Sequence, residues 1–225
     1  MIRRISTGIP GLDSLIEGGI IQGSAILVSG TTGTGKTIFS SQFLWHGLQK
    51  GEPGVYLTLE EDPIDLKENM SVFGWNFEKY EKRDLCRIIS HDPFEISDVL
   101  SIVLDAIEEI KAKRFVLDSI SILGLYLKGP HAIRKKLYTI SRTIKKAGCT
   151  SLIISEIPEE ESKMLSRFGV EEFVTDGVIV LNYLEYAAGG LQRSLIIRKM
   201  RRTNHGKEIY PFEITEKGIV LRRSE

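Results

Sequence analysis

One eight-residue segment has the residue types and spacing of a phosphate-binding loop. Residues 30–37 read GTTGTGKT and fit the pattern G-x-x-x-x-G-K-[ST], between an apolar run and a helical pattern. Its glycines let backbone N–H groups turn toward phosphate oxygens, and the following helix adds its positive N-terminus. In such a loop Lys36 reaches the β- and γ-phosphates of a nucleotide and the Thr37 hydroxyl binds Mg²⁺. The predicted nucleotide-binding residues are Thr31, Thr32, Gly33, Thr34, Gly35, Lys36, Thr37 and Ile38.

Carboxylates that could complete a hydrolytic site follow two other apolar runs. Asp118 comes directly after residues 115–117, where the carboxyl end of a strand would place a metal-binding acid at the crevice of an open sheet. Glu60 and Glu61 follow another predicted strand, and either could orient and deprotonate an attacking water. Each has a structural alternative, because Asp118 could cap a helix or turn and the glutamate pair could form a solvated turn.

A second unusual stretch concentrates positive charge near the C-terminus. Residues 197–205 read IRKMRRTNH. Alternate residues of a strand point to opposite sides, so we expect Lys199 and Arg201 on one side and, on the other, Arg198, Met200 and Arg202. Two cations on one side could bind the phosphates of a nucleotide or of nucleic acid. A charged sheet edge that blocks aggregation is the alternative.

The surrounding chain alternates between strand-like and helix-like segments. Short runs rich in Val, Ile and Leu predict buried strands at 25–29, 55–59, 85–89, 115–117 and 151–154. Capping signals and amphipathic spacing predict helices at 37–49, 63–73, 96–110 and 133–147. Consecutive strands follow at 178–186, 194–200, 209–214 and 219–221, with a hairpin turn at 187–190. This order predicts an α/β fold, a mostly parallel sheet flanked by helices with an antiparallel C-terminal edge.

Length and composition narrow the class of protein. The chain has 225 residues, 30 Lys and Arg against 30 Asp and Glu, and two cysteines. The length suits one domain over residues 1–225, and zero net charge argues against a protein that binds polyanions with its whole surface. Two cysteines without zinc-site spacing favour a reducing compartment, so we expect a cytoplasmic protein. Without an apolar run of roughly 20 residues or a secretory signal, we expect neither a membrane protein nor a secreted one.

Taken together, these motifs resemble those of the KaiC-like ATPases, a branch of the RecA superfamily. The resemblance covers essentially the whole chain, and it includes the opening TGIPGLD at 7–13 and the glycine pair at 18–19. It also includes the phosphate loop, the acids at 60–61 and 118, and the basic stretch at 198–205. The resemblance implies a RecA-like core and a hexameric ring that binds ATP and Mg²⁺ between its subunits.

The resemblance also implies roles for individual residues. Glu60 is similar to the family's catalytic glutamate, with Glu61 as its companion. Lys199 and Arg201 would reach the γ-phosphate of the nucleotide on the neighbouring subunit, acting in trans as arginine fingers do. Two further residues would lie near that nucleotide, Thr203 and His205.

One stretch departs from the family's self-phosphorylating domains. In those domains adjacent Ser and Thr precede a Thr-Asp pair and receive phosphate, whereas Glu172 and Phe173 occupy the matching positions here. The stretch resembles the family's slowly hydrolysing domains. We therefore expect slow ATP hydrolysis that serves as a regulatory or signalling switch, and no self-phosphorylation at these two positions. Ser166 and Thr175 lie nearby and leave autokinase activity elsewhere open.

Two other functions stay open. The chain could bind ATP to assemble with an unidentified protein partner and scarcely hydrolyse it, as a nucleotide-dependent scaffold. Alternatively, the shared fold would suit a RecA-type recombinase that binds single-stranded DNA. Zero net charge disfavours nucleic acid, and so does the segment at 157–169, which could be a mobile loop facing a central channel. This loop would repel phosphates, because Glu156 precedes it and it carries Glu159, Glu160 and Glu161 against only Lys163 and Arg167.

Overall fold

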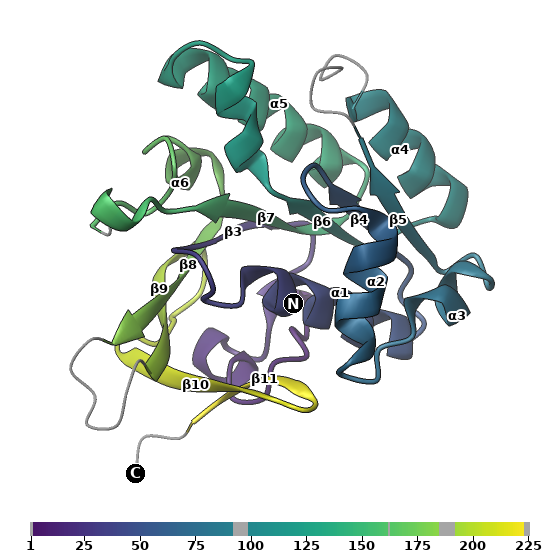
Figure 1. Cartoon of the computed structure of the whole chain (residues 1–225), viewed down its shortest axis with the longest axis horizontal. Coiled ribbons are helices and arrows are strands. Elements are labelled where there is room, and N and C mark those ends of the chain that lie inside the picture. The colour runs from purple at the N-terminus through teal and green to yellow at the C-terminus, as the bar shows by residue number, and fades with distance from the viewer. Residues whose placement is uncertain (1, 92–98, 162, 185–191, 223–225) are drawn as a thin grey trace.

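A nine-stranded sheet forms the centre of the molecule in a computed structural model, which describes residues 2–91, 99–161, 163–184 and 192–222 (Figure 1). The strand order is β11-β10-β9-β8-β3-β7-β6-β4-β5, and β1 and β2 form a separate antiparallel pair. The strands are β1 Arg4–Ile5, β2 Ile20–Ile21, β3 Ala25–Gly30, β4 Gly54–Thr58, β5 Cys86–Ser90, β6 Arg114–Asp118, β7 Thr150–Glu156, β8 Gly177–Leu184, β9 Gln192–Met200, β10 Ile209–Thr215 and β11 Gly218–Leu221. The α-helices are α1 Lys36–Gln49, α2 Pro63–Ser71, α3 Phe77–Glu81, α4 Val99–Ile110, α5 Pro130–Lys146 and α6 Glu171–Val174. Short 3₁₀ helices span Asp13–Ile16, Ile120–Leu125 and Glu159–Glu161.

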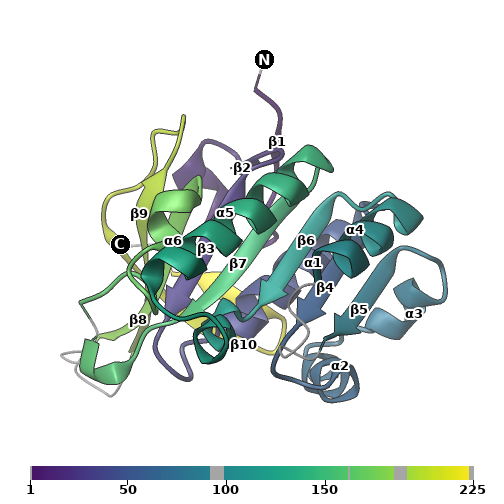
Figure 2. The same ribbon diagram turned by 90° about the horizontal axis from the view of Figure 1, so that it is seen from above.

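Helices cover both faces of the sheet. Alternate residues of β3 show why, since Ile26 and Val28 belong to a buried core shared with α1, α2 and α3. Ala25 and Leu27 belong to a second core, which they share with α4 and α5. Figure 2 shows α4 and α5 lying side by side along the strands of one face. A strand that is apolar on both faces is typical of a parallel sheet between helices, so this part of the predicted fold is confirmed.

The sheet changes direction at β8. Strands β3, β4, β5, β6, β7 and β8 pair in parallel, whereas β9, β10 and β11 add to the β8 side as antiparallel neighbours. The predicted antiparallel C-terminal edge is therefore confirmed. Because parallel strands share one carboxyl edge, the ends of β3, β4, β6 and β7 lie together there, and this edge carries the loops that follow them.

A β-bulge in β9 changes the side-chain pattern predicted for the basic stretch. Val178 lies opposite Lys199 and Ile179 lies opposite Ile197, so Arg198 is an extra residue on β9. The bulge reverses the alternation. Met200 is buried with the core while Arg198 is exposed, so the prediction that these two residues share a side is wrong. Arg201 lies just beyond the end of the strand.

Most predicted elements are present with shifted ends. The helix predicted from 133 begins at Pro130, because Pro is well suited to the first helical turn. The helix predicted at 63–73 ends at Ser71, and Asp62 caps it as expected by accepting a hydrogen bond from the Ile64 N–H at 2.7 Å. The first part of the helix predicted at 96–110 and the hairpin turn at 187–190 lie outside the described residues. None of the helices in the described ranges has the length and apolar character needed to span a membrane.

Candidate nucleotide-binding site

The segment between β3 and α1 is folded as a tight loop by its own polar contacts. Gly33 and Gly35 have φ values of +74° and +99°, a region that glycine tolerates best. Lys36 Nζ donates to the carbonyl oxygens of Gly30 and Thr31, both at 2.9 Å, so its ammonium group lies inside the curve of the loop. Burial lowers the pKa of Lys36 from its usual value, opposed by nearby carboxylates, of which Glu156 acts most strongly. A half-buried ammonium group that donates to loop carbonyls is well placed to bind an anion.

A hydroxyl and a carboxylate meet beside this loop. Thr37, in the first turn of α1, donates its hydroxyl hydrogen bond to Asp118 Oδ2 at the end of β6, over 2.9 Å. Tyr56 Oη donates to the same oxygen at 2.7 Å, and Tyr56 Oη lies 3.2 Å from Ser40 Oγ. Burial raises the pKa of the Asp118 carboxyl, while the hydrogen bonds from Tyr56 and Thr37 act in the opposite direction. The two residues predicted to hold a metal ion are therefore adjacent.

This pair fits Mg²⁺ by the chemistry of its donors. Mg²⁺ prefers hard oxygen ligands and usually takes only one or two carboxylates, with phosphates and waters completing its shell. Thr37 and Asp118 offer a hydroxyl and a carboxylate at one place. Among the described residues, no group of three or more His, Cys, Asp or Glu side chains could hold a metal ion alone. The site therefore suits an ion that arrives with a nucleotide.

The two neighbouring glutamates point in different directions. Glu60 accepts a hydrogen bond from Ser119 Oγ at 2.6 Å and lines the hollow in front of the phosphate loop. Glu61 instead accepts from Asn69 Nδ2 of α2 at 2.6 Å. Burial raises the pKa of both carboxyl groups above the usual value, and for Glu60 the charges of Glu156 and Asp118 add to the effect. The geometry thus separates a carboxylate that faces the hollow from one that anchors α2.

A hollow of about 320 Å³ joins these groups into one site. Its lining consists of Thr32, Gly33, Gly35, Lys36, Thr37, Ile38, Glu60, Asp118, Ser119, Glu156, Arg193 and Ile214. Thr31 and Thr34 are buried residues of the loop itself, and the Thr34 hydroxyl donates to the Thr31 carbonyl at 2.9 Å. Most of the predicted nucleotide-binding residues and both predicted metal ligands are therefore brought together.

Several residues at this site were not predicted from the sequence, and three of them show why. Glu156 ends β7 and lines the hollow, and the rule that located Asp118 at a strand end would have located it too. Arg193 and Tyr183 lie on the antiparallel edge, and both donate to the Gly33 carbonyl, with Tyr183 Oη at 2.7 Å and Arg193 Nη2 at 3.2 Å. Nothing in the local sequence signals these two contacts, because they depend on how β8 and β9 pair.

The predicted trans-acting residues lie at the opposite end of the sheet from the hollow. Gly30, at the phosphate loop, pairs with Leu181, whereas Ile26 pairs with Gly177, which in turn lies opposite Met200. Four residues along a parallel strand correspond to about 13 Å. Lys199 and Arg201 flank Met200, so they belong to this far end and do not line the hollow of their own chain.

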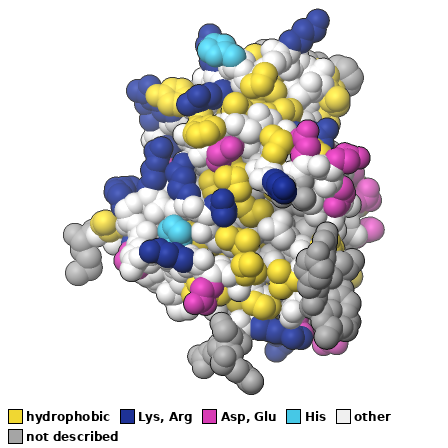
Figure 3. All heavy atoms as spheres, turned by 90° about the vertical axis from the view of Figure 1, so that its left-hand side faces the viewer, with side chains coloured by type: hydrophobic (Ala, Val, Ile, Leu, Met, Phe, Trp, Pro, Cys, Tyr) yellow, Lys and Arg dark blue, Asp and Glu magenta, His cyan; other side chains and the backbone are white. Residues whose placement is uncertain are grey.

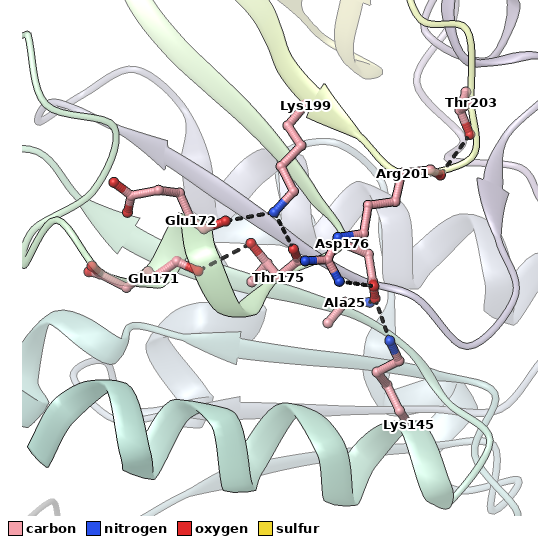
Figure 4. A network of polar contacts seen from close by, with 9 residues as sticks. All are labelled: Ala25, Lys145, Glu171, Glu172, Thr175, Asp176, Lys199, Arg201 and Thr203. Carbon is pink, nitrogen blue, oxygen red and sulfur yellow. Dashed lines mark hydrogen bonds and ion pairs between the residues drawn. The ribbon is translucent and has the colours of Figure 1, made fainter. Parts of the chain in front are cut away.

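At that far end each of these side chains contacts its own chain (Figure 4). Lys199 Nζ donates to the carbonyls of Glu172 and Thr175, at 2.7 and 2.6 Å, and burial lowers the pKa of Lys199. The Thr203 hydroxyl accepts from Arg4 Nη1 at 3.0 Å. His205 Nδ1 lies 2.8 Å from the Gly206 carbonyl. On the face where β8, β9 and α6 lie, basic side chains gather toward one side and acidic ones toward the other (Figure 3).

The fold and the site define a P-loop nucleotide-binding protein with a RecA-like core. The comparisons are more specific, because residues 5–225 match the family model of the KaiC ATPase. A UPF0273 protein of Thermotoga maritima is 42% identical over 100% of this chain and 98% of its own length. The crystal structure of a KaiC-like protein from Pyrococcus horikoshii superposes with a TM-score of 0.91 at 43% identity, covering 99% of this chain and 100% of that one. The chain belongs to the KaiC-like ATPase family.

A more distant relative shows the relation to longer members of the family. Circadian clock protein KaiC3 of Synechocystis is 35% identical over 98% of this chain but only 46% of its own length. This chain is therefore similar to about half of that protein. The expected resemblance to KaiC-like ATPases is confirmed, and family membership carries nucleotide binding with it.

Proposed function

We propose that the chain binds ATP with Mg²⁺ and slowly hydrolyses it within a hexameric ring, as a regulatory switch. The observation that carries this proposal is the contact between Thr37 and Asp118 beside the Lys36 ammonium group, in a hollow that Glu60 also lines. Lysine, hydroxyl and carboxylate are the groups that P-loop enzymes use for the β- and γ-phosphates and for the metal ion.

In this proposal each group of the hollow has a defined task. Bound Mg²⁺, held by Thr37 and Asp118, would neutralise charge on the phosphates. Glu60 orients a water and accepts its proton while the water oxygen bonds to the γ-phosphorus and the bond to the β–γ bridging oxygen breaks. Ser119 holds Glu60 toward the hollow at 2.6 Å. Because burial raises the pKa of Glu60, this carboxylate is a stronger base than an exposed glutamate.

The location of the remaining cations supports the proposed ring. Lys199 and Arg201 lie at the end of the sheet opposite the hollow, so a second copy is needed for either to reach a bound nucleotide. Contacts in which one surface meets a different surface of the next copy close into rings when the rotation allows it. We propose that Thr203 and His205 lie near the same nucleotide, and that residues 1–225 act as one unit of the ring.

The test compares two neighbouring variants. Glu60→Gln should still bind Mg²⁺-ATP but release phosphate at least about 100-fold more slowly, because the general base is lost. Glu61→Gln is the matched control, and its rate should fall only a few-fold because the Glu61 carboxylate contacts Asn69. Mass by light scattering, with and without Mg²⁺-ATP, is recorded in the same samples as phosphate release.

Three outcomes would contradict parts of this proposal. Unchanged turnover of Glu60→Gln would remove the role of Glu60. A nucleotide-dependent hexamer of the wild-type chain without phosphate release would favour the scaffold function. A wild-type monomer that hydrolyses ATP at the full rate would remove the trans role of Lys199 and Arg201.

A further inference from the structure

A nearly buried carboxylate, Asp176, lies at the amino end of β8 (Figure 4). Its backbone N–H donates to the Ala25 carbonyl at 2.7 Å, and its Oδ2 accepts from the Ala25 N–H at 3.0 Å. Lys145 Nζ, at the C-terminal end of α5, donates to the same Oδ2 at 2.7 Å. One carboxylate oxygen of Asp176 thus accepts two hydrogen bonds, and the negative charge of Asp176 is paired with Lys145.

The other oxygen of Asp176 faces Arg201. Arg201 Nη1 lies 3.6 Å from Asp176 Oδ1, which is too long for a hydrogen bond. The Arg201 backbone is more tightly fixed, since its N–H donates to the Asp176 carbonyl at 2.9 Å. Arg201 is exposed, and exposed ion pairs hold their partners weakly. Asp176 therefore fixes where the Arg201 backbone lies while it holds the guanidinium loosely.

Lys199 is constrained differently. Its ammonium group donates short hydrogen bonds to the carbonyls of Glu172 and Thr175, at 2.7 and 2.6 Å. Moving Lys199 would break both bonds, whereas the Arg201 guanidinium would give up only a long ion pair within the part of the chain that the structure describes. Of the two cations, Arg201 is the one that can leave its present position at low cost.

There is space for that movement. Lys145, Asp176 and Arg201 line a hollow of about 360 Å³ between α5 and the end of β9. The hollow is also lined by Arg142 and Lys146, so the surrounding charge is mostly positive. Positive charge nearby repels the guanidinium, and it weakens the attraction of the single carboxylate for Arg201.

We propose that Asp176 is a positioning residue that holds Arg201 ready for the neighbouring subunit's nucleotide, and that Lys145 limits how strongly it does so. The proposal rests on the trans role of Arg201 in the proposed function. With Lys145 present, Asp176 is already paired, so Arg201 exchanges this carboxylate for a phosphate, which carries more negative charge. Without Lys145, Asp176 would pair with Arg201 alone and compete with the phosphate.

The test is a double-mutant cycle on phosphate release. Lys145→Ala should lower kcat by about 5-fold, because coupled residues of one charge network typically interact on this scale. Lys145→Arg should restore the wild-type rate. Asp176→Asn keeps an oxygen for the Ala25 N–H but removes the competing charge, so adding Lys145→Ala to it should change kcat less than about 2-fold. Lys135→Ala removes an exposed lysine of the same helix that does not line the hollow, so it is the matched control and should match the wild type.

Salt provides a second measurement that does not require Asp176→Asn to fold. Raising KCl from about 50 to 300 mM screens exposed ion pairs and frees Arg201 from Asp176. The kcat of Lys145→Ala should therefore rise relative to that of Lys135→Ala as salt increases. Thermal unfolding and light scattering confirm that each variant is folded and assembled.

The outcomes separate this inference from the proposed function. Arg201→Ala is measured first, and if it hydrolyses ATP at the wild-type rate, the trans role itself is wrong. If Arg201→Ala is inactive but Lys145→Ala is as active as the wild type, only the positioning role is wrong. An equal loss from Lys145→Ala in the presence and absence of Asp176→Asn, or a salt-independent loss, would also overturn the positioning role.

Discussion

Two lysines at opposite ends of the sheet are held in the same way. Lys36 donates to two carbonyls of the phosphate loop at 2.9 Å, and Lys199 donates to two carbonyls around α6 at 2.7 and 2.6 Å. Burial lowers the pKa of both. Their surroundings differ, because Lys36 lies beside Thr37 and Asp118, which suit a metal ion. Lys199 instead lies near the charged groups of Arg201, Asp176 and Glu172 (Figure 4).

In the proposed function, one chain carries two complementary parts of a site, at two ends of its sheet. The hollow at the phosphate loop supplies a lysine, metal ligands and a base. The far end supplies cations held on carbonyls and on Asp176. Because each part is formed within a single chain, substitutions in one part should affect nucleotide binding and substitutions in the other should affect turnover.

Substitution of the two lysines gives the largest expected effects. Lys199→Ala should lower turnover by about 10³-fold, because it removes a cation that acts on the transition state in trans. Lys36→Ala should weaken Mg²⁺-ATP binding by about 10- to 100-fold, since charge-assisted contacts to phosphate are lost. Calorimetric titration with Mg²⁺-ATP, at protein concentrations where single subunits predominate, distinguishes the two variants, because only Lys36→Ala should bind weakly. Weak binding by Lys199→Ala under these conditions would show that its lysine acts on its own chain's site.

Mixing two inactive variants sharpens the comparison further. Lys36→Ala lacks the loop lysine and Arg201→Ala lacks a trans cation, so a 1:1 mixture contains interfaces in which both are intact. Random assembly should restore on the order of a quarter of wild-type turnover. The control mixture of Lys36→Ala with Glu60→Gln should stay inactive, because both changes affect the same half of the site. An inactive test mixture that nevertheless forms mixed rings would contradict the two-part site.

The dependence of turnover on pH gives the smallest expected effect. Glu60 must be ionised to accept a proton, and burial raises its pKa. Turnover should therefore fall several-fold on acidification, with a midpoint above the value of about 4.3 for an ordinary glutamate. A pH–rate profile of the wild type checks this, and Glu61→Gln should keep the same midpoint. If the midpoint moves in Glu61→Gln, the assignment of Glu60 as the base is wrong.

Several parts of the site could be predicted because they are local. The phosphate loop occupies contiguous residues, and Asp118 and Glu60 each follow an apolar strand, so their place at the carboxyl edge follows from parallel pairing. The choice between Glu60 and Glu61 was not predictable in this way. It depends on Ser119 and Asn69, which approach from other elements of the fold.

The basic stretch shows that side-chain alternation along a strand cannot be predicted across a β-bulge. Simple alternation placed Met200 and Arg198 on one side, but the bulge buries Met200 and exposes Arg198. Pairing between β8 and β9 sets this register, and it also brings Arg193 and Tyr183 to the Gly33 carbonyl. Such contacts join residues about 150 positions apart, so no short-range sequence pattern predicts them.

By itself, the sequence determined the phosphate loop, the parallel order of the elements and the type of chemistry at the carboxyl edge. These follow from residue types at short spacing, where backbone geometry and hydrophobic burial leave few alternatives. Only the tertiary structure decided which glutamate faces the hollow and at which end of the sheet each cation lies. It also showed that backbone carbonyls bind Lys199 and that Asp176 pairs with Arg201. Those features depend on strand register and on long-range hydrogen bonds, which form only when the whole sheet is assembled.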